Sequence, residues 1–286
     1  MKKNVLTFMG MLTLLFLIGC QKTETPSHKN LKKAKETEQI KKTNVPTVFI
    51  HGYSGTERTM KNMVKDFEKD DFGKEELVME VDESGNVSTE NMNAEVFKEN
   101  NPMVRLVFSD SKSHQWNQAE WIKSALTFLK KEYHVEEVNL VGFSMGGISS
   151  FLYLETFQND ETQPKVKKVA TIGAPFNEFI ENEEQELDDI LKNGPQTVSE
   201  QLVNYENLSD NLPKETSFLL IGGQLSESKK GDGTVPISSS LGVYNLLEKK
   251  GIPVKNEVIF GVNASHSSLR KNEDVDRFLS DFLWQS

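Results

Sequence analysis

The sequence predicts an α/β domain in which a mostly parallel sheet is covered by helices on both faces. Seven apolar segments of strand length recur along the chain, and helical patterns separate many of them. Such alternation is typical of parallel sheets, because a helix must carry the chain back to the start of the next strand. The roughly 240 residues after the N-terminal segment suffice for one such domain. The candidate strands are 46–50, 76–81, 103–108, 137–143, 166–172, 217–222 and 256–260.

Two helical patterns are clear from the spacing of their apolar residues. The first has a stripe that we expect to be buried, made of Trp121, Ala125, Phe128 and Leu129. The second is the C-terminal helix, for which Asn272 is a plausible N-cap. Its apolar face consists of Val275, Phe278, Leu279, Phe282 and Leu283.

The strand at 137–143 runs directly into a Gly-x-Ser-x-Gly motif centred on Ser144. In the α/β-hydrolase fold, this strand-to-helix turn pushes a serine Oγ out of the sheet into a pocket. The flanking glycines Gly142 and Gly146 are needed because side chains there would collide with a neighbouring strand and helix. The alternative is a serine in an ordinary tight turn. The apolar strand before the motif and the apolar helical face after it favour Ser144 as a nucleophile.

His266 is the candidate general base. In this fold the nucleophile comes first in the chain, then the acid, then the histidine. Of the five histidines, only His266 follows Ser144, and it lies in a loop of small polar residues after the last predicted strand. A solvated loop histidine is the alternative.

Asp232 is the candidate acid, since it follows the predicted strand 217–222 and lies between two glycines. A tight turn there can aim a short carboxylate inward to orient the imidazole. An Asp-Gly pair is also common in plain surface turns. Glu227 and Asp274 are weaker rivals, and Asp274 is better placed in the first turn of a helix.

The strand 46–50 ends in His51-Gly52-x-x-Gly55, which predicts a loop for an oxyanion hole. One donor should be the N–H of Met145, directly after the nucleophile and at a helix N-terminus. The other should be the N–H of Tyr53, with that of Ser54 as the alternative. We expect His51 to brace this loop by hydrogen bonding rather than to transfer protons.

Taken together, these four motifs resemble one group of α/β-hydrolases, the predicted cell-surface hydrolases of unknown function from Gram-positive bacteria. The resemblance covers about residues 45–286. It implies the α/β-hydrolase fold and a Ser144–Asp232–His266 triad, and it does not supply a physiological substrate. Such a mechanism needs no cofactor and no metal, and no His/Asp/Glu cluster in the sequence indicates one.

Residues 1–19 are predicted to be a lipoprotein signal peptide. Two lysines precede an apolar run shorter than the ~20 residues of a spanning helix, and Leu17-Ile18-Gly19-Cys20 matches a bacterial lipobox. An uncleaved anchor helix is the alternative. Cys20, the only cysteine, would be lipidated, which excludes disulfides and thiol chemistry from the folded domain. We therefore expect an exported protein that is lipid-anchored to the extracellular face of the cell membrane.

Residues 20–44 are predicted to be a flexible basic tether, because they have too few apolar side chains to form a core. Residues 20–42 carry seven lysines against three glutamates, a net +4. Residues 43–286 carry 24 basic against 40 acidic side chains, a net −16. The basic tether suits an anionic membrane surface, whereas the acidic body argues against a nucleic-acid partner. The oligomeric state is not predicted.

The segment at about 176–215 lacks a strand pattern and is expected to form a helical lid inserted over the pocket. One helix has a stripe of Leu187, Ile190 and Leu191, and a second has Val198, Leu202 and Tyr205. The segment holds eleven acidic residues and two lysines. Such a lid could admit neutral substrates and repel anions. Equally, it could be a solvated insertion whose charge has no bearing on the substrate.

The predicted activity is cleavage of a carboxylic ester, from a small molecule or a lipid, through an acyl-enzyme intermediate. An acyltransferase, thioesterase or peptidase with the same triad remains open, because a fold and triad do not fix the acyl acceptor. So does a surface binding lipoprotein on a hydrolase scaffold. The modest apolar content of the insertion favours an esterase over a lipase.

Overall fold

The computed structural model describes residues 40–90, 97–181 and 184–285. The predicted signal peptide, Cys20 and most of the predicted tether lie outside the described residues. The described chain begins beside the amino ends of the strands. There the Lys41 N–H donates to the Trp284 carbonyl at 2.8 Å, and the Thr43 N–H donates to the Asn101 side chain at 2.8 Å.

The core of the domain is an eight-stranded sheet with the order β3-β2-β4-β1-β5-β6-β7-β8. Every neighbouring pair is parallel except β2 and β3. All seven predicted strands are present, and the predicted mostly parallel architecture is confirmed. The strands are β1 (Thr47–Ile50), β2 (Lys74–Val81), β3 (Val87–Thr89), β4 (Pro102–Phe108), β5 (Glu137–Phe143), β6 (Lys165–Ile172), β7 (Ser217–Gln224) and β8 (Val254–Phe260).

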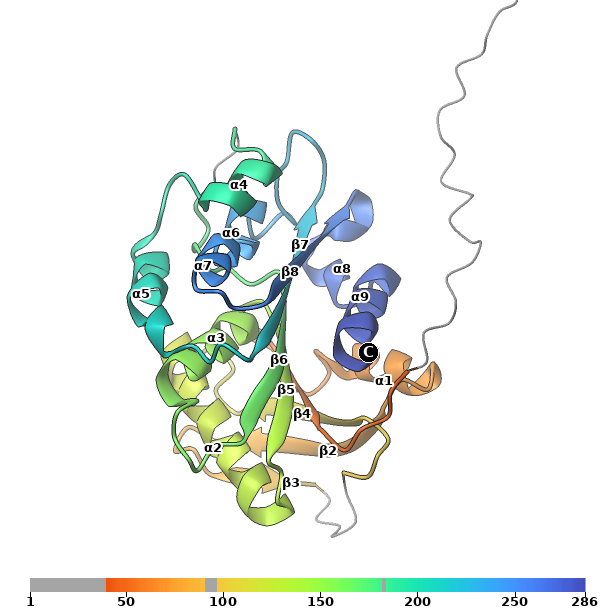
Figure 1. Cartoon of the computed structure of the whole chain (residues 1–286). Coiled ribbons are helices and arrows are strands. Elements are labelled where there is room, and N and C mark those ends of the chain that lie inside the picture. The colour runs from red at the N-terminus through yellow and green to blue at the C-terminus, as the bar shows by residue number, and fades with distance from the viewer. Residues whose placement is uncertain (1–39, 91–96, 182–183, 286) are drawn as a thin grey trace, which may run out of the picture. The chain divides into compact units, whose positions relative to one another are not determined.

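Helices cover both faces of this sheet. The helix pair α1 and α9 packs on one face and α2, α3 and α5 on the other (Figure 1). The helical segments are α1 (Lys61–Lys69), α2 (Gln115–Tyr133), α3 (Met145–Phe157), α4 (Leu187–Asn193), α5 (Glu200–Leu208), α6 (Ile237–Ser240), α7 (Tyr244–Lys249), α8 (His266–Leu269) and α9 (Glu273–Trp284), with short 3-10 turns η2 (Ser209–Asn211) and η3 (Val262–Ala264). None of the helices in the described part of the chain is long and apolar enough to cross a bilayer.

The two predicted helical patterns are confirmed. In α2, Trp121, Ala125 and Leu129 are buried, and only Phe128 is half-buried. The α9 helix is capped as expected, since the Asn272 side chain accepts from the N–H of Asp274 at 2.9 Å.

The α9 helix lays its apolar face on the sheet side that also holds α1. There the Phe67 and Trp284 rings meet edge to face, with centroids 5.2 Å apart.

The insertion between β6 and β7 forms two helices, α4 and α5, as its apolar stripes indicated. Ile190, Leu202 and Tyr205 are buried. Val198 differs from the expectation, with 43 % of its surface exposed. It precedes Ser199, whose side chain caps α5 by accepting from the Leu202 N–H at 3.1 Å, so Val198 lies outside the helix that should have buried it.

Asp276 is a partly buried carboxylate where α9 faces α1. Burial, together with the nearby Asp66, Asp70 and Glu273, raises the pKa of Asp276 to about 7. This folded-state pKa lies above the unfolded value of 3.8. The contribution to stability is therefore fully present below about pH 4 and is lost as the pH rises through 7.

We expect Asp276→Asn to be more stable than the wild type at pH 8, by about 1–2 kcal/mol, and to lose this advantage as the pH falls from 7 to 4, so that none of it remains at pH 4. Urea unfolding at both pH values measures it. The matched control is Asp274→Asn, an exposed carboxylate on the same helix that pairs with Arg277. Equal stability of the Asp276 variant and the wild type at pH 8 would contradict the prediction.

Candidate active site

Ser144 sits at the sharp turn between β5 and α3. Its φ of 53° and ψ of −124° are strained for a residue with a side chain, and such backbone strain persists only when the surroundings enforce it. Here the Ser144 N–H donates to the Ile172 carbonyl of β6 at 2.8 Å. A β carbon on Gly142 would lie 2.5 Å from the Gly146 carbonyl oxygen, and one on Gly146 would lie 2.5 Å from that of His51. The turn therefore forms only with glycine at both positions.

Asp232 and His266 are brought together by the loops after β7 and β8. His266 Nδ1 lies 2.6 Å from Asp232 Oδ2, and the His266 N–H donates to the Asp232 carbonyl at 2.9 Å. Asp232 is buried, with its side chain 0 % exposed, and its Oδ1 accepts from the N–H groups of Thr234 and Val235 at 2.9 and 2.7 Å. The carboxylate is thus held rigidly by its own turn and has one oxygen left for the imidazole.

The Asp232–His266 pair lies against the strand ends beside Ser144. The His266 ring centroid is 4.8 Å from that of Phe143, the residue before Ser144. A β carbon on Gly173, directly after β6, would lie 3.1 Å from His266 Nδ1 and 3.0 Å from Asp232 Oδ2. No hydrogen bond joins the Ser144 hydroxyl to His266 in the described residues. Such bonds are often loose before a substrate binds.

The loop after β1 lies against the start of α3. A β carbon on Gly52 would lie 2.8 Å from Ser144 Cβ and 3.4 Å from the Met145 nitrogen. The Ser54 N–H is occupied, because it donates to the Ser111 carbonyl at 2.8 Å. Of the two donors considered in this loop, Tyr53 is therefore the better placed to act together with Met145.

His51 holds this loop in place. It is buried, and its Nε2 accepts from the Phe108 N–H at 3.1 Å, so Nδ1 carries the proton and donates to the Gly52 carbonyl at 2.8 Å. Burial lowers the pKa of His51, outweighing the opposing effect of the Gly52 hydrogen bond. These contacts are those of the loop brace that the sequence analysis expected.

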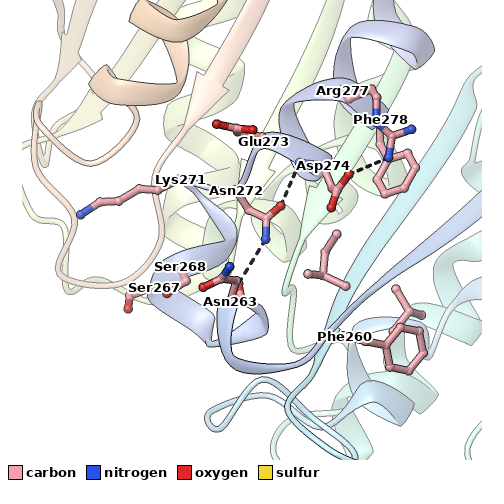
Figure 2. Close-up of a pocket in the computed structure, with 12 residues that line it drawn as sticks. Phe260, Asn263, Ser267, Ser268, Lys271, Asn272, Glu273, Asp274, Arg277 and Phe278 are labelled. Atoms are coloured by element: carbon pink, nitrogen blue, oxygen red, sulfur yellow. Dashed lines mark hydrogen bonds and ion pairs between the residues drawn. The ribbon is translucent and has the colours of Figure 1, made fainter. Parts of the chain in front are cut away.

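The rival acids lie elsewhere. Asp274 forms an ion pair of 2.8 Å with Arg277 on the surface of α9 (Figure 2). Glu227 is exposed in the loop between β7 and α6. Neither hydrogen-bonds to His266 in the described residues.

Two open cavities flank the candidate residues. One of about 790 Å³ lies between β8, α8 and the start of α9, with Ser267 and Ser268 in its wall (Figure 2). The other, of about 430 Å³, lies beside the Asp232 turn and is lined by Lys230, Thr234 and Pro236 among others. Neither wall contains Ser144, so the larger cavity is not the place where chemistry at Ser144 would occur.

Sequence reasoning missed two residues that complete this arrangement. Phe143 and Gly173 both touch His266, yet neither was a candidate. The available signal was positional: each comes at the end of, or directly after, a predicted parallel strand, where functional groups of α/β sheets gather.

Comparison with known proteins gives the same architecture. Residues 34–286 match the model of a family described as "Alpha/beta hydrolase of unknown function (DUF915)". A gene product of Listeria innocua is similar in structure, with 25 % identity, a TM-score of 0.76, and coverage of 84 % of this chain and 93 % of that one. A putative cell surface hydrolase from Lactobacillus plantarum has 21 % identity, a TM-score of 0.64, and coverage of 84 % and 91 %. No curated protein sequence matches the chain.

We expect His51 to remain neutral, with the proton on Nδ1, to below its usual pKa of 6.5. The stability that its neutral form contributes is then lost as the pH falls below 6.5, because the unfolded chain binds that proton first. NMR titration of the ¹⁵N-labelled imidazoles, with His51→Gln to assign the signal, measures this. A His51 ring that titrates above 6.5 would show that the brace is wrongly assigned.

Proposed function

This chain belongs to the DUF915 family of α/β hydrolases, and from that premise we propose that it is a serine hydrolase that cleaves a carboxylic ester. The observation that carries the proposal is the contact of 2.6 Å between His266 and the buried Asp232, placed against the strand ends beside Ser144. A carboxylate held by its own turn fixes the imidazole tautomer with Nδ1 protonated. That leaves Nε2 as the base.

In the proposed reaction, His266 Nε2 takes the hydroxyl proton as Ser144 Oγ attacks the ester carbonyl. The carbonyl oxygen becomes an oxyanion, which the N–H groups of Met145 and Tyr53 stabilise. The intermediate collapses by breaking the bond to the alcohol, and the imidazolium returns its proton to that alcohol. Water, deprotonated by His266, then attacks the acyl-enzyme and releases the acid and free Ser144.

The proposed location is the outer face of the cell membrane, through a lipid on Cys20. The lipobox sequence supports it, and the structurally similar Lactobacillus plantarum protein is called a putative cell surface hydrolase. The described chain enters the domain at Lys41 and Thr43, at the amino ends of the strands. The candidate site lies at the carboxyl ends, so the tether would join the domain at the edge away from the site.

The first experiment is labelling of the purified protein with a fluorophosphonate, which reports an activated serine without knowledge of the substrate. We expect the wild type to be labelled and Ser144→Ala to be unlabelled while keeping the wild-type thermal midpoint. No labelling of the folded wild type, or equal labelling of Ser144→Ala, would refute the nucleophile.

The same assay separates the acid from its rival. Asp232→Asn should slow labelling by about 10³-fold or more, because the imidazole loses the partner that sets its tautomer. Asp274→Asn is the matched control, since it removes the rival carboxylate, which pairs with Arg277 instead, and it should label at the wild-type rate. Product analysis with added alcohols then distinguishes hydrolysis from acyl transfer.

The acidic insertion predicts a preference for neutral substrates. Between Phe176 and Glu215 the eleven acidic residues outnumber the two lysines, and they lie in the segment between β6 and β7. We expect a neutral ester to be cleaved faster than its carboxylate analogue at low salt. The difference should shrink in high salt, which screens exposed charges. Equal turnover of both esters at low salt would show that the insertion's charge has no bearing on the substrate.

A further inference from the structure

Arg270 is a half-buried cation with an unusual set of neighbours. It lies four residues after His266, and its guanidinium group is 5.2 Å from the centroid of the Phe143 ring. Its Nη1 donates to the Thr59 carbonyl at 2.8 Å. Its Nε is buried without a hydrogen-bond partner in the described residues. Burial lowers the pKa of Arg270, and no carboxylate in the described part of the chain forms an ion pair with it.

Another arginine of the same domain, Arg105, does have a carboxylate partner. Arg105 is buried more completely than Arg270, and it is neutralised by Glu75 at 2.6 Å. A buried charge without a counterion costs folding free energy. We therefore attribute the position of the Arg270 side chain to its two contacts, the Phe143 ring and the Thr59 carbonyl.

Both of those contacts lead to the candidate site. The Phe143 ring that meets Arg270 also meets the His266 imidazole, with centroids 4.8 Å apart. Thr59 closes a turn with Thr56 through two hydrogen bonds. The Thr59 N–H donates to the Thr56 carbonyl, and the Thr56 N–H donates to the Thr59 hydroxyl, each at 2.8 Å. This turn ends the loop that begins at His51 and carries the Tyr53 N–H. One guanidinium group thus joins the strand before Ser144, the helix of His266 and the loop of the proposed oxyanion hole.

We propose that Arg270 is a positioning residue that holds the Phe143 ring against the His266 imidazole and fixes the loop bearing Tyr53. Its role in turnover rests on the proposed function, because it assumes that His266 is the base. Its effect on the His266 ring does not, and can be measured in a protein of any activity.

Two consequences follow. A displaced imidazole slows proton transfer more than it weakens substrate binding, since the reacting atoms must be aligned within a fraction of an ångström. In addition, the Phe143 ring lies 4.8 Å from the His266 imidazole, centroid to centroid, and its ring current acts on the His266 ring protons. A Phe143 ring that is no longer held in place therefore changes the NMR chemical shifts of those protons.

The test compares the full-length wild type with Arg270→Met, which keeps the length of the side chain and removes its charge. The NMR spectrum should show the His266 ring-proton signals moved from their wild-type positions, because the neighbouring Phe143 ring is displaced. For a neutral ester, kcat should fall about tenfold while KM changes by less than about twofold. The fluorophosphonate labelling rate should fall with kcat.

The matched control is Arg277→Met. Arg277 lies 4.5 Å from the Phe278 ring, so it makes the same kind of contact on the next helix, but it is exposed and paired with Asp274 (Figure 2). Its removal should leave the His266 ring-proton signals, kcat and labelling rate unchanged. Arg270→Lys keeps the charge and loses the planar group, so it should keep only part of kcat.

A folded Arg270→Met protein with wild-type His266 ring-proton signals and kcat overturns the proposal, as do equal changes in Arg277→Met. If Arg270→Met does not fold, Arg270→Lys with wild-type kcat overturns it. A wild type that neither labels nor turns over an ester defeats the proposed function alone. The change in the His266 ring-proton signals then still decides whether Arg270 acts on that ring.

Discussion

The close approach of β1, β5 and α3 is the constraint on which the site depends. β1 and β5 pair in parallel register, with Ile50 opposite Gly142, so the two strands end together. Gly146 then passes so near the end of β1 that its missing β carbon would lie 2.5 Å from the His51 carbonyl oxygen. Because the contact admits no side chain, it sets the position of the helix start. The strained Ser144 and the loop from His51 are thereby placed against each other.

Asp232 and His266 follow β7 and β8, at the far edge of the sheet, and must reach Ser144 from there. β5 and β8 are separated by β6 and β7, and neighbouring strands lie about 4.8 Å apart, so the gap is on the order of 14 Å. The loops after β7 and β8 span it by crossing the end of β6. At that end Gly173 has a φ of +57°, and a side chain there would press on both Asp232 and His266. The pair therefore depends on a glycine that belongs to neither loop.

The sequence predicts what depends on local pattern and misses what depends on tertiary contact. The seven predicted strands are short segments rich in apolar residues. β3 was missed because its three residues are exposed or half-buried at the sheet edge, where no apolar run is required. His266 followed from chain order alone, and Asp232 from its turn. No pattern in the sequence marks Glu155 as buried. It is 1 % exposed under α5, and burial raises its pKa to about 9. A residue that looks charged in the sequence is therefore neutral in the fold.

The insertion is bound to the domain more firmly than its charge suggests. Tyr205 of α5 packs on Phe151 of α3, with ring centroids 5.6 Å apart, and on Phe176. On the α4 side, Lys230 from the loop of Asp232 pairs with Glu186 at 2.7 Å and donates to the Gln185 carbonyl.

Moving α5 away would expose Tyr205 and Leu202, at a cost of about 2 kcal/mol for each large apolar side chain. It would also bring the buried carboxyl of Glu155 into water, where it ionises at neutral pH and opposes re-docking. If the insertion opens to admit a substrate, α5 is therefore the part that stays.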